Sequence, residues 1–66
     1  MKLQINGGQR DFPENLTVAM LVEHLGMKAD RVAVELNLEI VPRTQWPSMP
    51  LKDGDKLEIV HFVGGG

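Results

Sequence analysis

Three glycines at the end of the sequence are the residues whose chemistry stands out first. Gly64, Gly65 and Gly66 follow a β-branched and aromatic run with no polar turn between them. Because glycine lacks a Cβ, such a tail can thread a channel that is only a peptide wide. A free α-carboxylate at its end is ionised near neutral pH and is inert toward nucleophiles. We expect it to become an electrophile only if another enzyme activates it, for example by joining it to AMP.

The simplest alternative is an ordinary frayed terminus, because the ends of most chains are poorly ordered. On composition alone the two interpretations are about equally good, so the rest of the sequence has to decide between them. We divide the chain into a folded domain over residues 1–63 and a flexible tail over residues 64–66.

The two histidines are the other side chains with acid–base potential. His61 has no serine, cysteine or paired carboxylate at a spacing typical of catalysis, so we interpret it as a structural or partner-contacting residue. His24 falls off the apolar stripe of the predicted helix and should be exposed. The histidines lack the spacing of a metal motif, and the carboxylates occur singly. We expect no catalytic residue, no metal and no bound cofactor.

The absence of cysteine restricts both the fold and the chemistry. With 66 residues and no disulfide, the chain is one small domain, and 42% hydrophobic with 24% charged residues is a globular composition. No side chain can carry a persulfide or a thioester. A net charge of −2 and three aromatic residues argue against nucleic-acid binding. No stretch has the length of a membrane span or the apolar block of a signal peptide, so we expect a cytoplasmic protein.

A β-hairpin is predicted at the start of the chain, and one helix follows it. Residues 1–5 alternate polar and apolar, 6–8 suit a tight turn, and 9–12 can return as a second strand. The helix is predicted over residues 18–25, with Thr17 as its N-cap, from the helical spacing of Val18, Leu21, Val22 and Leu25. Leu16 and Leu21 have the spacing of a hydrophobic staple, and Gly26 suits a left-handed cap.

Three more strands are predicted in the second half of the chain. Alternation over 31–36 indicates an interior strand, and 39–41 a brief one that ends at Pro42. A structured loop follows, which is either irregular chain or a single helical turn over 43–46, pinned by the Trp46 ring. After the Asp-Gly turn at 52–55, residues 56–63 form the last strand. We therefore predict an α+β fold, a mixed sheet of four to five strands on one main helix, with its first and last strands side by side.

The last strand carries two apolar residues where polar ones are expected. If Leu57 and Ile59 face the helix, Val60 and Phe62 lie on the open face, which should otherwise be polar and bear residues such as Lys2, Gln4 and Glu35. Exposed apolar groups beside a reactive tail are a reasonable docking patch for a partner enzyme. The alternative is that single exposed apolar residues are ordinary on protein surfaces.

Over nearly its whole length the chain resembles the ThiS family of small ubiquitin-like sulfur carriers of thiamin biosynthesis. The matching segments include Lys2-Leu3-Gln4-Ile5-Asn6-Gly7, Val32-Ala33-Val34-Glu35-Leu36-Asn37, Ile40-Val41-Pro42-Arg43-Thr44-Gln45-Trp46 and Ile59-Val60-His61-Phe62-Val63-Gly64-Gly65-Gly66. The Val-Pro-Arg-x-Gln-Trp segment together with the glycine end is the specific part of the resemblance, because many unrelated proteins merely end in glycine.

The resemblance implies a β-grasp fold and a role as a sulfur carrier rather than an enzyme. In this family the terminal glycine, here Gly66, is adenylated by an E1-like (ThiF-like) enzyme that uses ATP and magnesium, while the carrier itself binds no cofactor. Sulfur from a donor such as a cysteine desulfurase then replaces AMP and leaves a thiocarboxylate. The carrier passes this sulfur to a ThiG-like thiazole synthase, with Gly64 and Gly65 in the tail that enters the partner's site.

Other readings share the fold but differ in the fate of the tail. A molybdopterin-synthase small subunit (MoaD-like) uses the same tail chemistry with another acceptor, although the segment 41–46 and the short length favour the thiamin carrier. A ubiquitin-like modifier would be joined through Gly66 to lysines of target proteins. A plain binding module would have an inert tail. We expect a monomer when the chain is free.

Overall fold

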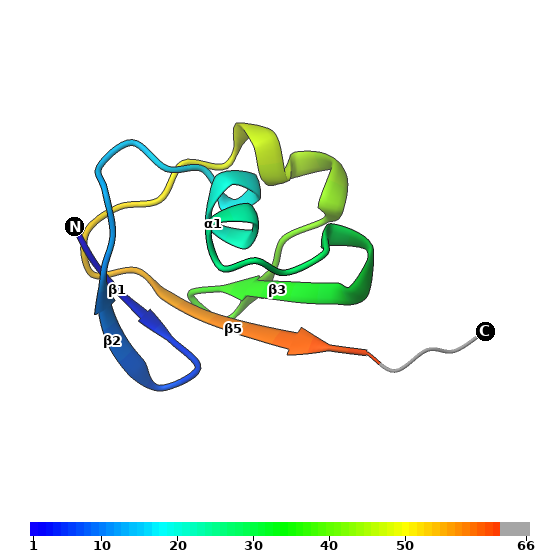
Figure 1. Cartoon of the computed structure of the whole chain (residues 1–66), viewed down its shortest axis with the longest axis horizontal. Coiled ribbons are helices and arrows are strands. Elements are labelled where there is room, and N and C mark those ends of the chain that lie inside the picture. Colours follow the sequence, from blue (N-terminus) through cyan, green and yellow to red (C-terminus); the bar gives the residue numbers. More distant parts are fainter. Residues whose placement is uncertain (63–66) are drawn as a thin grey trace.

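The computed structural model describes residues 1–62 and shows a five-stranded mixed sheet with one α-helix on one face (Figure 1). The strands are β1 (Lys2–Ile5), β2 (Gly8–Asp11), β3 (Val32–Leu36), β4 (Glu39–Ile40) and β5 (Lys56–His61). The helical elements are α1 (Val18–His24) and two 3-10 helices, η1 (Ala29–Arg31) and η2 (Arg43–Ser48). The predicted α+β fold of the β-grasp type is confirmed.

The last strand of the chain is the middle strand of the sheet. The strand order is β2-β1-β5-β3-β4, so the predicted adjacency of the first and last strands is confirmed. β5 runs parallel to β1, where Ile5 lies opposite Leu57, and antiparallel to β3 along five residue pairs from Val32–His61 to Leu36–Leu57. Pairing with β1 on one side and β3 on the other therefore fixes the direction in which β5 leaves the domain.

The Asn6 side chain extends the short pairing between β1 and β5. Only two residue pairs form that parallel ladder, because β1 turns away after Ile5. Beyond it the Asn6 backbone N–H donates to Leu57 O at 2.9 Å. The Asn6 amide then acts as a further peptide unit: Nδ2 donates to Ile59 O at 3.0 Å, and Oδ1 accepts from Ile59 N–H at 2.7 Å. The hairpin turn thus holds the middle of β5.

The hairpin turn and the helix termini follow from local sequence. Asn6 and Gly7 have φ of 50° and 86°, the left-handed backbone that a two-residue hairpin turn requires at both positions. The Thr17 hydroxyl accepts from Met20 N–H at 3.2 Å and caps α1 as predicted. Met20 stands where a capping box usually has Glu or Gln, and its sulfur accepts from Thr17 N–H. Gly26, at φ 74°, follows the C-cap as predicted.

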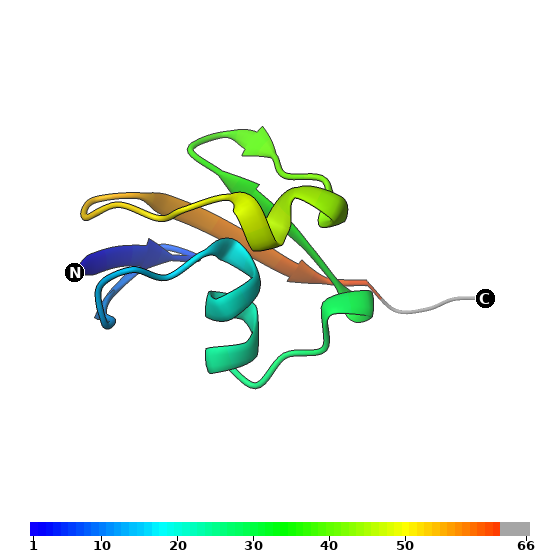
Figure 2. The ribbon, with the colours of Figure 1, turned by 90° about the horizontal axis from the view of Figure 1, so that it is seen from above.

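The core lies between α1 and the inner face of the sheet, and η2 closes its side (Figure 2). Trp46 is buried, and its indole N–H donates to Val41 O at 2.8 Å, which confirms that this ring pins the loop. The helical segment there runs through Ser48, longer than the single turn predicted. The buried apolar residues are Leu3, Ile5, Phe12, Leu16, Val18, Leu21, Val22, Val32, Val34, Val41, Trp46, Leu51, Leu57 and Ile59.

Several predicted boundaries were wrong by one or two residues. The second strand begins at Gly8 because this residue pairs with Ile5 across the turn. The helix ends at His24, and Leu25 becomes its C-cap. The connection before β3 contains the 3-10 helix η1, which lacks a hydrophobic period and so escaped prediction. β5 ends at His61, whereas Val63, the predicted end of this strand, lies outside the described residues.

We predict that Asn6→Gly lowers the free energy of unfolding by about 1–3 kcal/mol, because two hydrogen bonds contribute about 0.5–1.5 kcal/mol each. Glycine adopts φ 50° without strain, so the substitution removes the amide and spares the turn. Urea denaturation at neutral pH measures the loss.

Asn15→Gly is the matched control for this substitution. Asn15 also has a positive φ, 64°, but it is exposed, and within residues 1–62 its side chain makes no hydrogen bond. Any effect of glycine on the unfolded chain is therefore common to both variants. Equal losses of stability in the two would contradict a structural role for the Asn6 amide.

Candidate functional site

The end of β5 is where the predicted reactive tail begins. β5 ends at the side of the molecule opposite the N-terminus (Figure 1). After the strand, the Phe62 N–H donates to O of Arg31, the residue before β3, at 3.0 Å. The backbone is therefore hydrogen-bonded to the neighbouring chain segment as far as Phe62. The candidate site residues Gly64, Gly65 and Gly66 lie outside the described residues. Phe62 is the last described residue and is four positions before Gly66.

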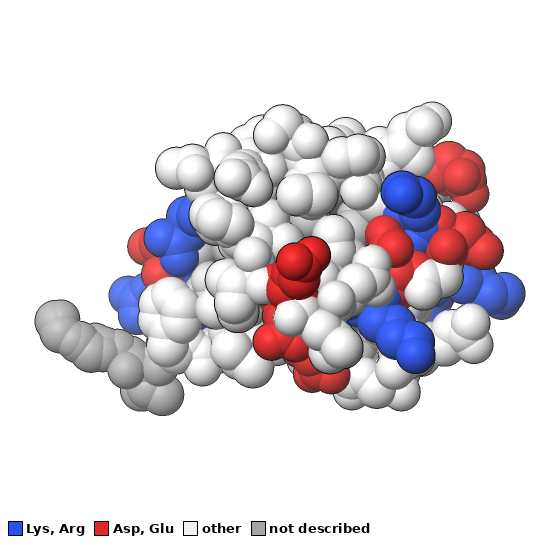
Figure 3. Space-filling model, turned by 180° about the vertical axis from the view of Figure 1, so that it is seen from behind, with Lys and Arg blue, Asp and Glu red and all other residues white. Residues whose placement is uncertain are grey.

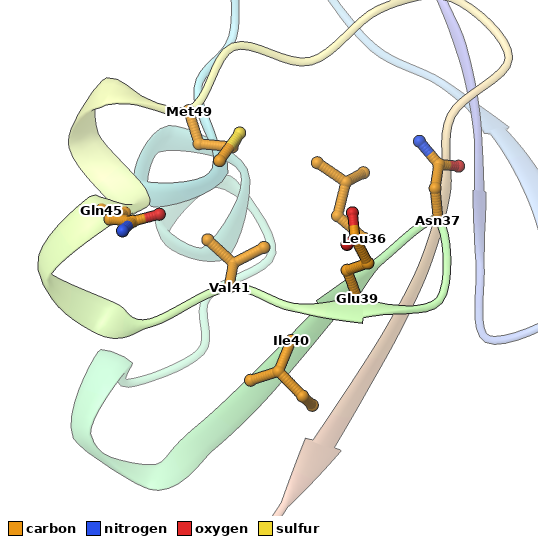
Figure 4. A pocket seen from close by; sticks show the side chains of 7 residues that line it. All are labelled: Leu36, Asn37, Glu39, Ile40, Val41, Gln45 and Met49. Carbon is orange, nitrogen blue, oxygen red and sulfur yellow. The ribbon is translucent and has the colours of Figure 1, made fainter.

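An apolar patch lies at this point, and we call it the exit patch: the exposed Ile40, Val60 and Phe62 together with the half-buried Ala33. The side chains of Val60, Phe62 and Ile40 are 56%, 47% and 66% exposed, so the predicted exposure of Val60 and Phe62 is confirmed. Val60 lies directly opposite Ala33 in the sheet. Ile40 points to the side of β4 opposite Glu39 and Val41 (Figure 4), toward the open face.

The expectation that the open face is otherwise polar was wrong at this end of the sheet. The polar residues Lys2 and Gln4 lie on β1, on the other side of β5 from β3. Ile40 was missed because the strand predicted over 39–41 has only three residues, too few to show a period. Its pairing with Glu35 places Ile40 on the open face, and strand register was the signal that could have found it.

A shallow hollow of about 240 Å³ joins part of the exit patch to the start of η2. Ala33, Ile40 and Phe62 line it together with Arg43. The Arg43 guanidinium lies 5.5 Å from the centre of the Trp46 ring and donates to Val32 O at 3.4 Å. The Val-Pro-Arg-x-Gln-Trp segment therefore places a cation at one border of the exit patch, supported by an aromatic face.

Two glutamates border the exit patch on its other side. Glu35 and Glu58 lie directly opposite each other on β3 and β5, and each is two residues along its strand from Ala33 or Val60. The flanking bonds Asn37 N–H to Lys56 O and Phe62 N–H to Arg31 O show that alternate pairs, including Glu35–Glu58, are hydrogen-bonded pairs. The Cα atoms of such a pair lie about 5.5 Å apart.

Neither carboxylate of this pair forms an ion pair within residues 1–62. Lys56 shares their face, but it lies opposite Gln4, toward β1. Seen from behind, one group of acidic side chains lies near the middle of the surface, and others lie at the right among Lys and Arg side chains (Figure 3). Like charges directly opposite each other in a sheet destabilise it. Repulsion between Glu35 and Glu58 therefore lowers the stability of the domain, and the pair lies immediately beside the exit patch.

A second hollow, of about 310 Å³, lies between β4 and η2 (Figure 4). Its lining consists of Leu36, Asn37, Glu39, Ile40, Val41, Gln45 and Met49. Glu39 is the one ionisable group among them, so the lining offers no acid–base pair and no set of metal ligands. We interpret this hollow as the space left where a two-residue edge strand meets a 3-10 helix.

The histidines occupy separate parts of the surface. His61 ends β5 opposite Val32 and is exposed, although its strand position aligns it with the buried Ile59. His24 is exposed as predicted, and its ring meets the edge of Phe12 at a centroid distance of 5.6 Å. Among residues 1–62, no three His, Asp or Glu side chains lie close enough together to hold a metal ion. Nor does that part of the chain include a helix long and apolar enough to cross a membrane.

The sequence profile of the ThiS family matches residues 3–66, from the buried Leu3 on β1 through the three glycines. This chain belongs to the ThiS family. It is 37% identical to the sulfur carrier protein ThiS of Bacillus subtilis, with 97% of this chain and 98% of that one covered. It is 30% identical to ThiS of Escherichia coli over the full length of both.

Solved structures of the family show the same fold. A crystal structure of the thiamine biosynthesis protein ThiS from Geobacter metallireducens superposes with a TM-score of 0.87, at 38% identity and with both chains fully covered. The chain is also 53% identical, over all its 66 residues, to part of a protein named thiazole synthase from Paramagnetospirillum magneticum. It spans a fifth of the length of that relative, and a fifth of a second thiazole synthase from Magnetococcus marinus.

We predict that Glu58→Gln stabilises the domain by about 0.2–1 kcal/mol, because it removes one of two directly opposed like charges. The free energy of unfolding, measured by urea denaturation at pH 7 and low salt, should rise. The gain should shrink at high ionic strength, where exposed charges are screened.

A double-mutant cycle with Glu35→Gln separates this repulsion from other effects of the substitution. Once Glu35 is neutral, Glu58→Gln has no opposed charge to relieve, so its gain should vanish. The same gain in both backgrounds would show that the two carboxylates do not interact.

Proposed function

We propose that this chain is a sulfur carrier protein of thiamin biosynthesis, and that Gly66 is the residue that carries the sulfur. The observation that carries the proposal is the match to the ThiS family through residue 66 in a chain that contains no cysteine. With no thiol on any side chain, the carboxyl carbon at the glycine end is the position where sulfur can be held covalently.

Two steps convert an inert carboxylate into a sulfur donor in this proposal. A carboxylate oxygen of Gly66 attacks the α-phosphorus of ATP in an E1-like (ThiF-like) adenylyltransferase that supplies magnesium, and pyrophosphate leaves. The terminal sulfur of a persulfide, on a donor such as a cysteine desulfurase, then attacks the acyl carbon and AMP leaves, and a thiol reductant cleaves the resulting sulfur–sulfur bond to release the thiocarboxylate. The resulting thiocarboxylate is the better nucleophile, because its charge resides largely on a polarisable sulfur, as in thiolates generally.

The chain's own contribution to this chemistry is presentation, so we propose that it is a co-substrate and not an enzyme. The middle strand of the sheet leads into the tail, and Gly64 and Gly65 leave no side chain beside the reacting carbonyl. The exit patch offers the partner enzymes an apolar surface at the base of that tail. A thiazole synthase is the proposed acceptor, in keeping with the relatives of that name.

We predict that deletion of Gly66 abolishes thiocarboxylate formation and leaves the fold intact. The shortened tail places its carboxylate about 3.5 Å short of the reacting position, which is far outside the tolerance of a positioned reaction. Intact mass after incubation with the adenylyltransferase, ATP, magnesium and a sulfur donor gives the readout. The parent chain should gain the mass difference between sulfur and oxygen at Gly66.

The Asn15→Gly variant serves as the control, because it changes an exposed residue far along the sequence from the tail and must still be converted. Circular dichroism checks that the truncated chain is folded. Sulfur gained by the truncated chain would refute Gly66 as the carrier residue. An unmodified parent chain would refute the proposed function itself.

We predict that Phe62→Ala weakens binding to the adenylyltransferase about tenfold, because aromatic anchors carry a large share of interface energy. The free energy of unfolding should change by no more than about 0.5 kcal/mol, as is usual for exposed positions. Calorimetric titration and urea denaturation measure the two quantities.

Leu38→Ala is the matched control for Phe62→Ala. Leu38 is 88% exposed, but it sits in the β3–β4 turn and not in the exit patch. It should bind the adenylyltransferase as the parent does. An unchanged affinity for Phe62→Ala, or an equal loss for Leu38→Ala, would remove the exit patch from the interface.

A further inference from the structure

The hairpin turn at Asn6-Gly7 has a chemistry that the proposed function does not use. In an Asn-Gly sequence the backbone nitrogen of the glycine can attack the side-chain carbonyl carbon of the asparagine, because glycine has no side chain to obstruct the approach. The chain contains three asparagines, and Asn15 and Asn37 are each followed by a leucine. Asn6 is therefore the asparagine at which this intramolecular attack is least hindered.

The reaction that begins with this attack is deamidation. A bond forms between Gly7 N and Asn6 Cγ, the bond from Cγ to Nδ2 breaks, and ammonia leaves with the proton of the Gly7 amide. A five-membered succinimide ring remains, and water then opens it. Attack of water at Cγ gives aspartate at position 6, whereas attack at the backbone carbonyl carbon gives isoaspartate, in which the main chain runs through the former side chain. The reaction consumes only water.

The fold opposes ring closure through geometry and not through burial. Asn6 is exposed, so water reaches it. Its amide is fixed, however, because Nδ2 donates to Ile59 O at 3.0 Å and Oδ1 accepts from Ile59 N–H at 2.7 Å. Its φ of 50° is left-handed, a conformation in which ψ is about +47°. The succinimide ring requires a negative ψ, so it can close only after both hydrogen bonds break and the turn rearranges.

Both backbone polar groups of Ile59 depend on this amide. Glu58 and Val60 exchange their backbone hydrogen bonds with β3, so the N–H and C=O of Ile59, which lies between them, point toward β1. The main-chain ladder of β1 ends before it reaches this position. Within residues 1–62, the Asn6 amide is the partner of both groups.

Deamidation removes the donor from this pairing. A carboxylate only accepts hydrogen bonds, so an aspartate at position 6 leaves Ile59 O without a donor and places a negative charge beside it. Isoaspartate lengthens the main chain inside the turn by a carbon atom and displaces both former partners. The Ile59 side chain belongs to the core at 3% exposure, so the strand cannot turn away without exposing it. Either product therefore weakens the pairing of β1 with the middle strand of the sheet.

We propose that Asn6 is a deamidation site that the intact sheet protects, and that its deamidation loosens the middle of β5. Opening of the sheet and reaction at Asn6 then promote each other, because the opened sheet frees the amide and the reacted residue no longer pairs with Ile59. A chain whose last strand spends time away from β1 accumulates a modification that prevents normal pairing afterwards. The inference concerns the domain itself and does not depend on the chemistry of the tail.

The first test follows deamidation of the full-length parent chain in mildly alkaline buffer, with and without enough urea to unfold it. Peptide mapping by mass spectrometry detects the exchange of NH2 for OH at each asparagine. Asn15 and Asn37 are internal controls, because they also have positive φ, 64° and 50°, but precede leucine. In urea Asn6 should react faster than either control. Native buffer should slow its reaction at least about tenfold, because two hydrogen bonds must break first.

The second test measures what the modification does to the sheet. Asn6→Asp reproduces one product and should lower the urea midpoint of unfolding, whereas Asn15→Asp adds the same charge at an exposed position and should not. The isoaspartate form of the parent, separated by ion exchange, should show amide hydrogen exchange at Ile59 N–H that is at least about tenfold faster. Exchange at Leu21 N–H, which donates to Thr17 O in α1, should rise less, because a uniform loss of stability would raise both alike.

Each measurement has a result that overturns the inference. Equal rates at Asn6 in native buffer and in urea would show that the sheet does not protect this residue. A reaction at Asn15 or Asn37 as fast as that at Asn6 would remove its assignment as the site. An Asn6→Asp chain as stable as the parent, or an isoaspartate form with unchanged exchange at Ile59, would refute the loosening of β5. No partner enzyme enters these experiments, so all of these results leave the proposed function standing.

Discussion

The pairing of β1 with β5 is the constraint on which the rest of the structure depends. β5 is the middle strand, yet its parallel ladder with β1 has only two residue pairs before β1 turns back into the hairpin. The Asn6 amide replaces the missing peptide unit with two hydrogen bonds to Ile59. Because Asn6 is also the first residue of the hairpin turn, one residue both reverses β1 and continues its pairing. The position of Val60 and Phe62, just beyond Ile59, follows from this arrangement.

The inner face of the sheet, which packs against α1, is covered in part by segments that have little regular secondary structure. α1 has only seven residues and does not cover the sheet alone. The segment after η2 returns beside the start of α1, where Leu51 N–H donates to Leu16 O and Val18 N–H donates to Met49 O, both at 2.9 Å. Within η2, the indole N–H of Trp46 donates to Val41 O and fixes this helix to the end of β4. A small domain without disulfides thus completes its core with an ordered loop on the α1 side of the sheet.

Much of the fold could be predicted from the sequence, because strand and helix periods, the Asn-Gly turn, the Thr17 cap and the Trp46 anchor are local signals. Strand register is not local. The sequence places Glu35 and Glu58 on separate strands, and only the register set by β3 and β5 shows that they face each other. For the same reason Val60 and Phe62 could be identified from the alternation of one strand, whereas Ile40 in a two-residue strand could not. The bonds from Asn6 to Ile59 span 53 residues, and no pattern of neighbours indicates them.

The place of β5 in the sheet also has a consequence for how the protein is made. A ribosome synthesises β5 after every other element of the domain, yet β1 and β3 lie on opposite sides of it and do not pair with each other. Until β5 emerges, no strand can join the β1–β2 half of the sheet to the β3–β4 half. Contacts between such distant segments form late and slowly. A chain that ends before β5 lacks the strand that joins the two hairpins, so only molecules synthesised through β5 can form the complete sheet and the exit patch.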